Sequence, residues 1–206
     1  MLFRSVHSED QPKPDHSQVT MFISSATPIL LQTARATIYK SGFKERGVKA
    51  RIILDSGSQR SYITNRLKDE LSLPGECQET MLIKTFGSQD EKLQTCDAVC
   101  FGAKLPDGKD MKMSAYSVPL ICEPLTGQTV ALARNMYKHL NGIHLADYST
   151  GTEPAEVDIL IGSDQYWQIV TGEVRRGESG PTALRTRLGW IYLGQQRPQR
   201  VTVIHL

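Results

Sequence analysis

Apolar and polar positions alternate along much of this 206-residue chain. The clearest alternation runs through residues 34–39 and again through residues 48–54, with the turn signal Ser41-Gly42 between the two runs. Strict alternation is typical of strands that bury one face. We therefore expect the two runs to form a hairpin whose second strand ends at Asp55.

The rest of the chain continues this pattern, with turn signals such as Pro106-Asp107-Gly108 between the runs. Asn65 is expected to cap a helix that continues to Leu71, and residues 164–169 are expected to start a second short helix. Apolar residues at helical spacing between 128 and 146 predict a further helical segment. Many short strands with one or two helices predict an all-β domain. The other strand-like runs are residues 61–63, 81–86, 93–101, 111–120, 157–162, 183–184 and 188–193.

Composition divides the chain into three parts. Residues 1–24 are polar and rich in proline, which predicts a flexible leader or linker. Residues 25–195 hold the patterned runs and are expected to form one domain, and residues 196–206 are expected to be a tail or the start of a linker. The formal net charge of +2 is too small to indicate a nucleic-acid partner.

The cysteines bear on metal binding and on location. Their spacing is irregular, and no second ligand pair follows at a distance that would suit zinc, so free thiols in a reducing compartment are favoured over a metal site. The chain begins without a signal-peptide pattern, and no apolar run approaches the length of a membrane span. We therefore expect a cytoplasmic protein without metal or membrane association. The four cysteines are Cys77, Cys96, Cys100 and Cys122.

An acid placed directly after a buried strand is the most informative feature. Asp55 follows three apolar residues, 52–54, and precedes Ser56-Gly57-Ser58. Burial of a lone carboxylate is costly, whereas two carboxylates in one site can share a proton and activate a water molecule. An Asx turn at the end of a strand would also explain the acid. A second apolar strand that ends in glycine, residues 159–162, favours the functional interpretation.

Two segments together resemble the motifs of retropepsin-type aspartic proteases. They are Leu54-Asp55-Ser56-Gly57-Ser58 and Ile161-Gly162-Ser163-Asp164. A longer resemblance, over residues 159–167, 171–181 and 186–190, is to the peptidase domain of Pao/BEL-type retrotransposon polyproteins. It covers roughly residues 28–195.

The resemblance implies a fold and an activity. The fold would be a closed retropepsin-like (acid protease) barrel with one or two short helices. The activity would be that of an aspartic endopeptidase without a cofactor, which processes a retrotransposon polyprotein. Asp55 would be the catalytic acid, and Ser56, Gly57 and Ser58 would shape its loop. The strand that ends at Ile161 and Gly162 would pass behind this loop, where glycine permits a close approach.

The acid motif occurs once, since Asp107-Gly108 lacks both the apolar strand before it and the small residue between. The resemblance therefore requires a homodimer in which each subunit contributes Asp55. The two carboxylates would titrate as a coupled pair, and a polypeptide substrate would bind as an extended strand. The alternative is a catalytically silent interaction or structural module with the same fold.

Two further pairs of interpretations stay open. The hairpin over residues 83–99, with Phe86, Gly87 and Ser88 near its tip, is either a flap over the substrate or an ordinary surface hairpin. Arg60 and Asp164 either form a buried bidentate pair that braces the base of the dimer, or are two solvated charges.

Residues 177–181 superficially resemble the nucleophile loop of trypsin-like proteases. No supporting pattern surrounds His139 or His144, so a turn that packs against the strand of Trp190 is favoured. Trp167 and Trp190 are expected in the core. A basic cluster is expected to be a solvated face, because no aromatic residues are interleaved with it, and nucleic acid is not an expected partner of this domain. The cluster comprises Arg175, Arg176, Arg185 and Arg187.

Overall fold

The computed structural model describes residues 29–83, 92–125, 133, 136–148 and 154–195. The predicted leader (1–24) and tail (196–206) lie outside these residues. The strands are β1 (Ile29–Leu30), β2 (Thr33–Tyr39), β3 (Val48–Leu54), β4 (Tyr62–Thr64), β5 (Cys77–Ile83), β6 (Lys92–Lys104), β7 (Asp110–Val118), β8 (Ile159–Ile161), β9 (Val170–Arg175), β10 (Thr182–Thr186) and β11 (Gly189–Gln195). The α-helices are α1 (Asn65–Glu70) and α3 (Ser163–Ile169), and two 3-10 helices span Lys44–Arg46 and Lys138–Leu140.

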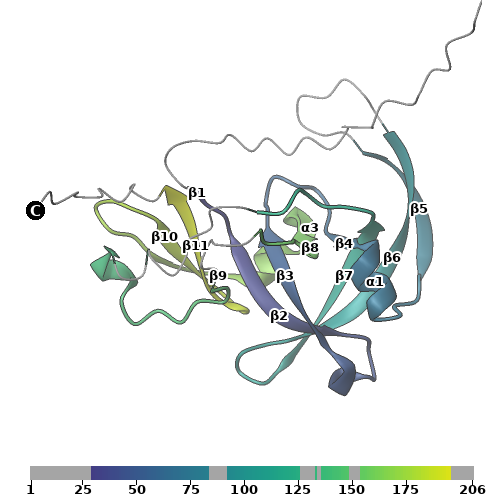
Figure 1. Ribbon diagram of the computed structural model, residues 1–206, viewed down its shortest axis with the longest axis horizontal. Coiled ribbons are helices and arrows are strands. Elements are labelled where there is room, and N and C mark those ends of the chain that lie inside the picture. The colour runs from purple at the N-terminus through teal and green to yellow at the C-terminus, as the bar shows by residue number, and fades with distance from the viewer. Residues whose placement is uncertain (1–28, 84–91, 126–132, 134–135, 149–153, 196–206) are drawn as a thin grey trace, which may run out of the picture.

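Six of these strands close into a barrel in the order β2-β3-β8-β4-β7-β6 (Figure 1). Pairing of β2 with β6 completes the ring, and β5 pairs with the first half of the long strand β6, residues 92–98. The expected all-β closed barrel with short helices is therefore confirmed. Closure removes most of the strand edges that would otherwise be open.

The predicted hairpin before Asp55 is also confirmed. Strands β2 and β3 pair antiparallel from Thr33 opposite Ile53 to Ile38 opposite Val48. Strand β8 then lies parallel to β3 on its other side, with Leu54 opposite Ile161. The end of β3 is thus fixed from both sides, and this pairing determines where Asp55 emerges.

The barrel interior is filled by apolar side chains from every strand of the ring. Alternation on β2, β3 and β7 places one face of each strand inside, as the sequence pattern predicts. Burial of this apolar surface is the main stabilising contribution to the fold. Fully buried members include Ile38, Ile52, Ile63, Phe101, Ile159 and Ile161.

Helix α1 begins at Asn65, the residue predicted to be its cap, and therefore starts one residue earlier than expected. Thr64, not Asn65, is the N-cap, and its hydroxyl oxygen accepts a hydrogen bond from Leu67 N at 3.3 Å. Thr64 suits this role because it ends β4 in an extended conformation, whereas Asn65 is already helical.

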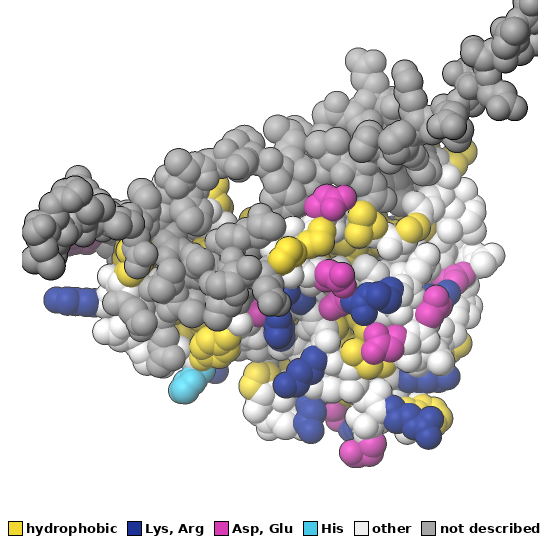
Figure 2. Space-filling model, in the orientation of Figure 1, with side chains coloured by type: hydrophobic (Ala, Val, Ile, Leu, Met, Phe, Trp, Pro, Cys, Tyr) yellow, Lys and Arg dark blue, Asp and Glu magenta, His cyan; other side chains and the backbone are white. Residues whose placement is uncertain are grey.

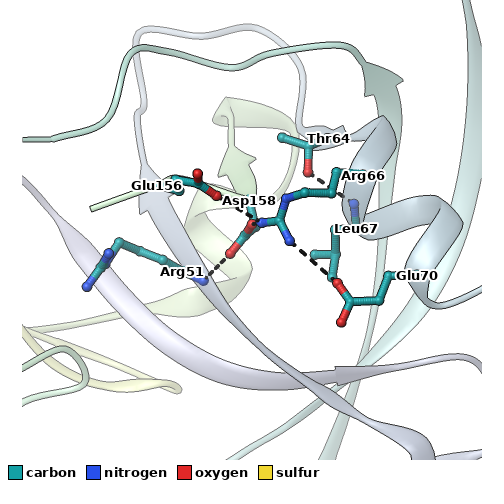
Figure 3. A network of polar contacts seen from close by, with 7 residues as sticks. All are labelled: Arg51, Thr64, Arg66, Leu67, Glu70, Glu156 and Asp158. Carbon is teal, nitrogen blue, oxygen red and sulfur yellow. Dashed lines mark hydrogen bonds and ion pairs between the residues drawn. The ribbon is translucent and has the colours of Figure 1, made fainter. Parts of the chain in front are cut away.

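Helix α1 is attached to the barrel by a polar network around Asp158 (Figure 3). The Asp158 carboxylate accepts a hydrogen bond from Arg51 N at 2.8 Å and pairs with the guanidinium of Arg66. Arg66 also pairs with Glu70 one turn along the helix and with Glu156. Burial raises the pKa of Asp158, and the Arg51 hydrogen bond and the Arg66 charge oppose that rise.

A second, four-stranded antiparallel sheet in the order β1-β11-β10-β9 lies beside the barrel (Figure 1). Its own apolar cluster includes side chains from the segment between β7 and β8, so that part of the segment covers this sheet. Residues 126–132 and 134–135 of the predicted helical segment lie outside the described residues, whereas Lys138–Leu140 forms a 3-10 helix. The cluster comprises Leu30, Ala133, Tyr137, Leu140, Ile143, Leu145, Ala183, Trp190 and Tyr192.

Residues 146 and 147 join the two sheets. Ala146 N donates to the carbonyl of Trp190 in β11 at 2.8 Å, and the carbonyl of Ala146 accepts from Arg35 N in β2 at 2.8 Å. The buried carboxylate of Asp147 pairs with Arg51 Nε at 2.7 Å and with Arg35 Nε at 3.1 Å. Arg35 and Arg51 lie opposite each other in the hairpin. Two guanidinium groups therefore compensate the burial of one carboxylate.

Within the described part of the chain, no helix combines the length and apolar character needed to cross a bilayer. No group of three or more His, Cys, Asp or Glu side chains in that part could hold a metal ion, and the four cysteines are free thiols.

Candidate functional site

Asp55 leaves the barrel at the point where β3 ends. Its backbone N–H donates to the carbonyl of Ile161 at 2.9 Å, which extends the β3–β8 ladder by one residue. The chain then turns, because Ser58 N donates to the Asp55 carbonyl at 3.2 Å and Gly57 N donates to Asp55 Oδ1 at 2.9 Å. The Asp55 side chain is exposed. The loop thus holds a carboxylate at the surface of the single chain.

The loop is pinned from behind by the residue that follows β8. A Cβ atom on Gly162 would lie 2.4 Å from the Arg60 carbonyl oxygen and 2.9 Å from that of Ser58. Gly162 N also donates to Ser61 Oγ at 3.1 Å, and Ser163 N donates to the Ser58 carbonyl at 2.8 Å. Only glycine fits this backbone contact without displacing the acid loop.

The ion pair between Arg60 and Asp164 that the sequence suggested is not formed among the described residues. Asp164 instead accepts two hydrogen bonds from Ser61, one from its backbone N at 3.0 Å and one from its hydroxyl at 2.7 Å. Ser61 is fully buried, whereas Arg60 is exposed. The backbone N–H and the hydroxyl of Ser61 therefore meet the hydrogen-bonding needs of the Asp164 carboxylate, and the exposed Arg60 is not required for this.

Tyr166 on helix α3 supports the strand that carries Asp55. Its hydroxyl donates to Gln32 Oε1 at 2.8 Å, and the Gln32 carbonyl accepts from Leu54 N at 2.9 Å. Burial and, to a smaller extent, the negative charge of Asp55 raise the pKa of Tyr166, while the Gln32 hydrogen bond opposes the rise. Sequence reasoning missed Gln32, because a glutamine between two strands has no distinctive local signal.

A cavity of about 520 Å³ lies on the outer side of the barrel, between α3 and strands β6 and β7. Arg60 and Asp164 line it, and Asp55 is not among its lining residues. Gln165 closes one side, since its amide pairs with Ser114 N at 3.2 Å and with the Ser114 carbonyl at 2.5 Å. The short strand β4 pairs with β7 only from Tyr116 onward, so it does not reach Ser114. The side-chain amide of Gln165 makes the hydrogen bonds to the Ser114 backbone that a longer β4 would make.

The flap candidates Phe86, Gly87 and Ser88 lie outside the described residues. The two strands that lead toward them are described. Strands β5 and β6 pair antiparallel from Cys77 opposite Ala98 to Ile83 opposite Lys92.

The serine-nucleophile interpretation of residues 177–181 finds no support. The ring of His139 packs so closely on Gly177 that a Cβ atom there would lie 2.3 Å from Nδ1. His139 Nε2 lies 2.9 Å from the Pro181 carbonyl oxygen. Among the described residues, no hydrogen bond joins His139 to Ser179. The turn contacts Tyr137 and His139, and a Cβ atom on Gly194 of β11, the strand of Trp190, would lie 4.0 Å from Pro181 Cα.

The two tryptophans differ. Trp190 is buried, as predicted, and the guanidinium carbons of Arg175 and Arg185 lie 4.8 and 5.4 Å from its ring centroid. Part of the basic cluster therefore covers an aromatic ring. The prediction that Trp167 lies in the core is wrong, because this side chain is 73% exposed. Helix α3 buries Gln165, Tyr166 and Ile169 instead.

Two solved structures align with most of this chain at low identity. The retroviral protease-like domain of Ddi1 from Leishmania major aligns with a TM-score of 0.37 and 12% identity, over 84% of this chain and 100% of that one. A retropepsin-like aspartic protease from Rickettsia conorii aligns with a TM-score of 0.31 and 11% identity, over 84% of this chain and 97% of that one. A search of curated proteins found no match.

A family model covers most of the chain. The family described as "Putative peptidase (DUF1758)" matches residues 41–202, which include the Asp55 loop, Gly162 and helix α3. The chain belongs to this family.

Proposed function

We propose that this protein is an aspartic endopeptidase whose active site forms between two identical subunits, each of which contributes Asp55. The observation that carries the proposal is an exposed carboxylate on a tight loop, at the end of a barrel strand and pinned by Gly162. Membership of a family described as a peptidase supports this assignment.

The setting of Asp55 suits a shared site. One carboxylate oxygen is held by Gly57 N, and no other described residue donates to the carboxylate. The side chain is exposed, so a second carboxylate can approach it. Because the backbone of the loop is anchored to β8 and α3, the carboxylate keeps its position during such an approach.

The chemistry follows from two carboxylates that share one proton. The charged member accepts a proton from a water molecule while the water oxygen bonds to the carbonyl carbon of the scissile peptide. The neutral member donates a hydrogen bond to the carbonyl oxygen, where negative charge develops. The C–N bond then breaks as the amine leaving group takes up a proton. This mechanism is the standard one for aspartic proteases.

The proposed substrate is a polypeptide in extended conformation, bound as an added strand. The resemblance of residues 159–167, 171–181 and 186–190 to Pao/BEL-type elements leads us to propose a retrotransposon polyprotein, processed in the cytoplasm.

The direct test is Asp55→Asn in the full chain, with cleavage of fluorescently labelled casein as the readout. We expect cleavage to fall by about a hundredfold or more, because an amide can neither accept the proton from water nor share one. The melting temperature should stay close to that of the wild type, since the side chain is exposed and an amide oxygen can still accept from Gly57 N.

The chain provides a matched control. Asp107 is also exposed, and its Oδ1 accepts from Lys109 N at 3.0 Å, in the same spacing as Asp55 and Gly57 at 2.9 Å. Asp107→Asn makes the same chemical change in a turn without the motif, and should cleave like the wild type. Undiminished cleavage by a purified Asp55→Asn protein would refute the proposal.

The alternative is a catalytically silent module that keeps the barrel. It predicts no casein cleavage by the wild type and no binding of a peptidomimetic with a hydroxyl at the scissile position. Binding of this inhibitor to the wild type, with loss in Asp55→Asn, would favour the protease.

A further inference from the structure

Helix α3 presents a large aromatic side chain to solvent. Trp167 is 73% exposed, the largest exposed fraction among the large apolar side chains that the structure describes. Single exposed apolar residues are common on protein surfaces, so exposure alone assigns no role. The position of Trp167 relative to Asp55 is the second observation.

Trp167 stands close to the acid loop. Its ring packs edge-on against Tyr166, with centroids 5.1 Å apart, and Tyr166 in turn supports the strand that carries Asp55 through Gln32. The backbone N–H of Ser163, the first residue of the same helix, donates a hydrogen bond to the Ser58 carbonyl in the acid loop. Four residues of α-helix rise about 6 Å, which places Trp167 within about one helical turn of this contact along the helix axis.

The strand that follows α3, β9, is also exposed to solvent. β9 is one of the two outer strands of the four-stranded sheet, and among the described strands only β10 pairs with it. Every residue from Thr171 to Arg175 is exposed, so that both faces of this stretch meet solvent. Val174 adds an apolar side chain that is 42% exposed. Unpaired edges of this kind are ready sites for pairing with another chain.

The shared-carboxylate site restricts where a second copy can lie. Two Asp55 carboxylates can share a proton only if the two-fold axis passes between them, so the surface around Asp55 must be buried in the dimer. A standard interface buries about 800 Å² on each partner, which corresponds to a disc with a radius of roughly 16 Å. Helix α3 is seven residues, about 10 Å, long and starts at the acid loop, so all of it lies closer to that loop than this radius.

We propose that Trp167 and the exposed stretch Thr171–Arg175 form the face on which a second copy of this chain docks, with Trp167 as the apolar anchor. This assignment rests on the proposed function, because the need to bring two Asp55 side chains together identifies the occupant as a second copy. Tryptophan is one of the residue types enriched among the few side chains that carry most of the binding energy of such interfaces.

The experiment is sedimentation velocity of the full chain over a range of concentrations, for the wild type, Trp167→Ser and Phe43→Ser. Phe43 is a matched control, since it is an aromatic residue that is 51% exposed. It precedes β3, whose seven residues span about 23 Å, whereas Asp55 follows that strand. We expect Trp167→Ser to weaken the dimer by about tenfold or more, and Phe43→Ser to leave it unchanged.

The outcomes separate this inference from the proposed function. A wild type that dimerises while Trp167→Ser dimerises equally well would overturn the docking face and leave the shared active site standing. A wild type that stays monomeric while it cleaves casein would overturn both. Thermal unfolding of Trp167→Ser that matches the wild type at a concentration where both are monomeric would show that the weakened dimer does not come from a damaged subunit.

Intrinsic fluorescence gives an independent readout, because the chain has two tryptophans and Trp190 is buried in the single subunit. Wild-type emission should shift to shorter wavelength as concentration rises, since the indole of Trp167 leaves water on docking. Trp167→Phe should lose this shift. A dimer that forms without any shift in the wild type would contradict the proposal.

Discussion

At the scale of single residues, the surroundings of Asp55 distinguish it from other turn acids. Asp55 and Asp107 make the same hydrogen bond to the backbone N–H two residues ahead. Only Asp55 follows a buried strand, and only its loop is held from behind by the residue after β8. The strand behind the loop, and not the turn itself, makes the carboxylate a candidate catalyst.

Gly162→Ala tests this contact. The added methyl group would lie 2.4 Å from the Arg60 carbonyl oxygen, so the acid loop must move away from β8. We expect a loss of about 2–3 kcal/mol in the free energy of unfolding, together with reduced cleavage, because backbone atoms cannot move aside as a flexible side chain can. Urea denaturation monitored by circular dichroism measures the first effect.

Gly108→Ala is the control for Gly162→Ala. Gly108 has φ of +81°, but a Cβ atom there would meet no other atom within 4 Å. Its replacement should therefore cost only about 1 kcal/mol of backbone strain and leave cleavage intact. A Gly162→Ala protein as stable as Gly108→Ala would show that the close passage is not required.

Residue-level prediction succeeded where the signal was local. The order of apolar strand, acid and glycine could be read directly from residues 52–57. The partner of Asp164 could not, because opposite charge suggested Arg60, whereas the fold brings the backbone and hydroxyl of Ser61 to the carboxylate. Trp167 was misplaced for a similar reason. The number of apolar residues on a seven-residue helix does not determine which of them faces the core.

At the scale of elements, the sequence pattern predicted the strands of the barrel and helix α3, because alternation and turn residues are local features. The segment between β7 and β8 could not be interpreted in this way. Its part around residues 146–147 links two sheets through Ala146 and the buried carboxylate of Asp147. These contacts join residues that lie far apart in the sequence, and no local pattern encodes them.

The attachment of α1 to the barrel gives a pH-dependent prediction. Burial raises the pKa of Asp158, and the positive charge of Arg66 offsets part of that rise (Figure 3). Arg66→Met removes the offset, so the pKa of Asp158 in the folded protein should rise further above its value in the unfolded chain. The folded state then favours protonation, and stability falls as the pH rises through that range.

We therefore expect Arg66→Met to lower the free energy of unfolding by about 1–2 kcal/mol at pH 7, and by less at an acidic pH below the raised pKa of Asp158, where its carboxyl group is protonated. Arg66 is half exposed, which keeps the effect below that of a fully buried pair. Glu70→Gln removes only the exposed partner and should have little effect at either pH. Equal losses at both pH values for Arg66→Met would show that Asp158 titration is not involved.

At the scale of the whole molecule, the charged side chains on the face that Figure 2 shows do not gather by sign. Acidic and basic side chains are intermixed there, in keeping with a formal net charge of +2. The ring of six strands is closed, whereas β9, the strand that follows α3, pairs with β10 alone among the strands that the structure describes. Each subunit thus carries one carboxylate of the proposed site, that of Asp55, and the exposed stretch Thr171–Arg175 of β9.

The measurement that tests the shared site most directly is cleavage in mixtures of wild-type and Asp55→Asn subunits. If each site needs one carboxylate from each subunit, an equal amount of Asp55→Asn protein, exchanged into dimers at random, should lower the activity of a fixed amount of wild type to about half, and a large excess should abolish it. Asp107→Asn subunits should not inhibit. Wild-type activity that stays constant at every excess of Asp55→Asn would contradict an active site built from two chains.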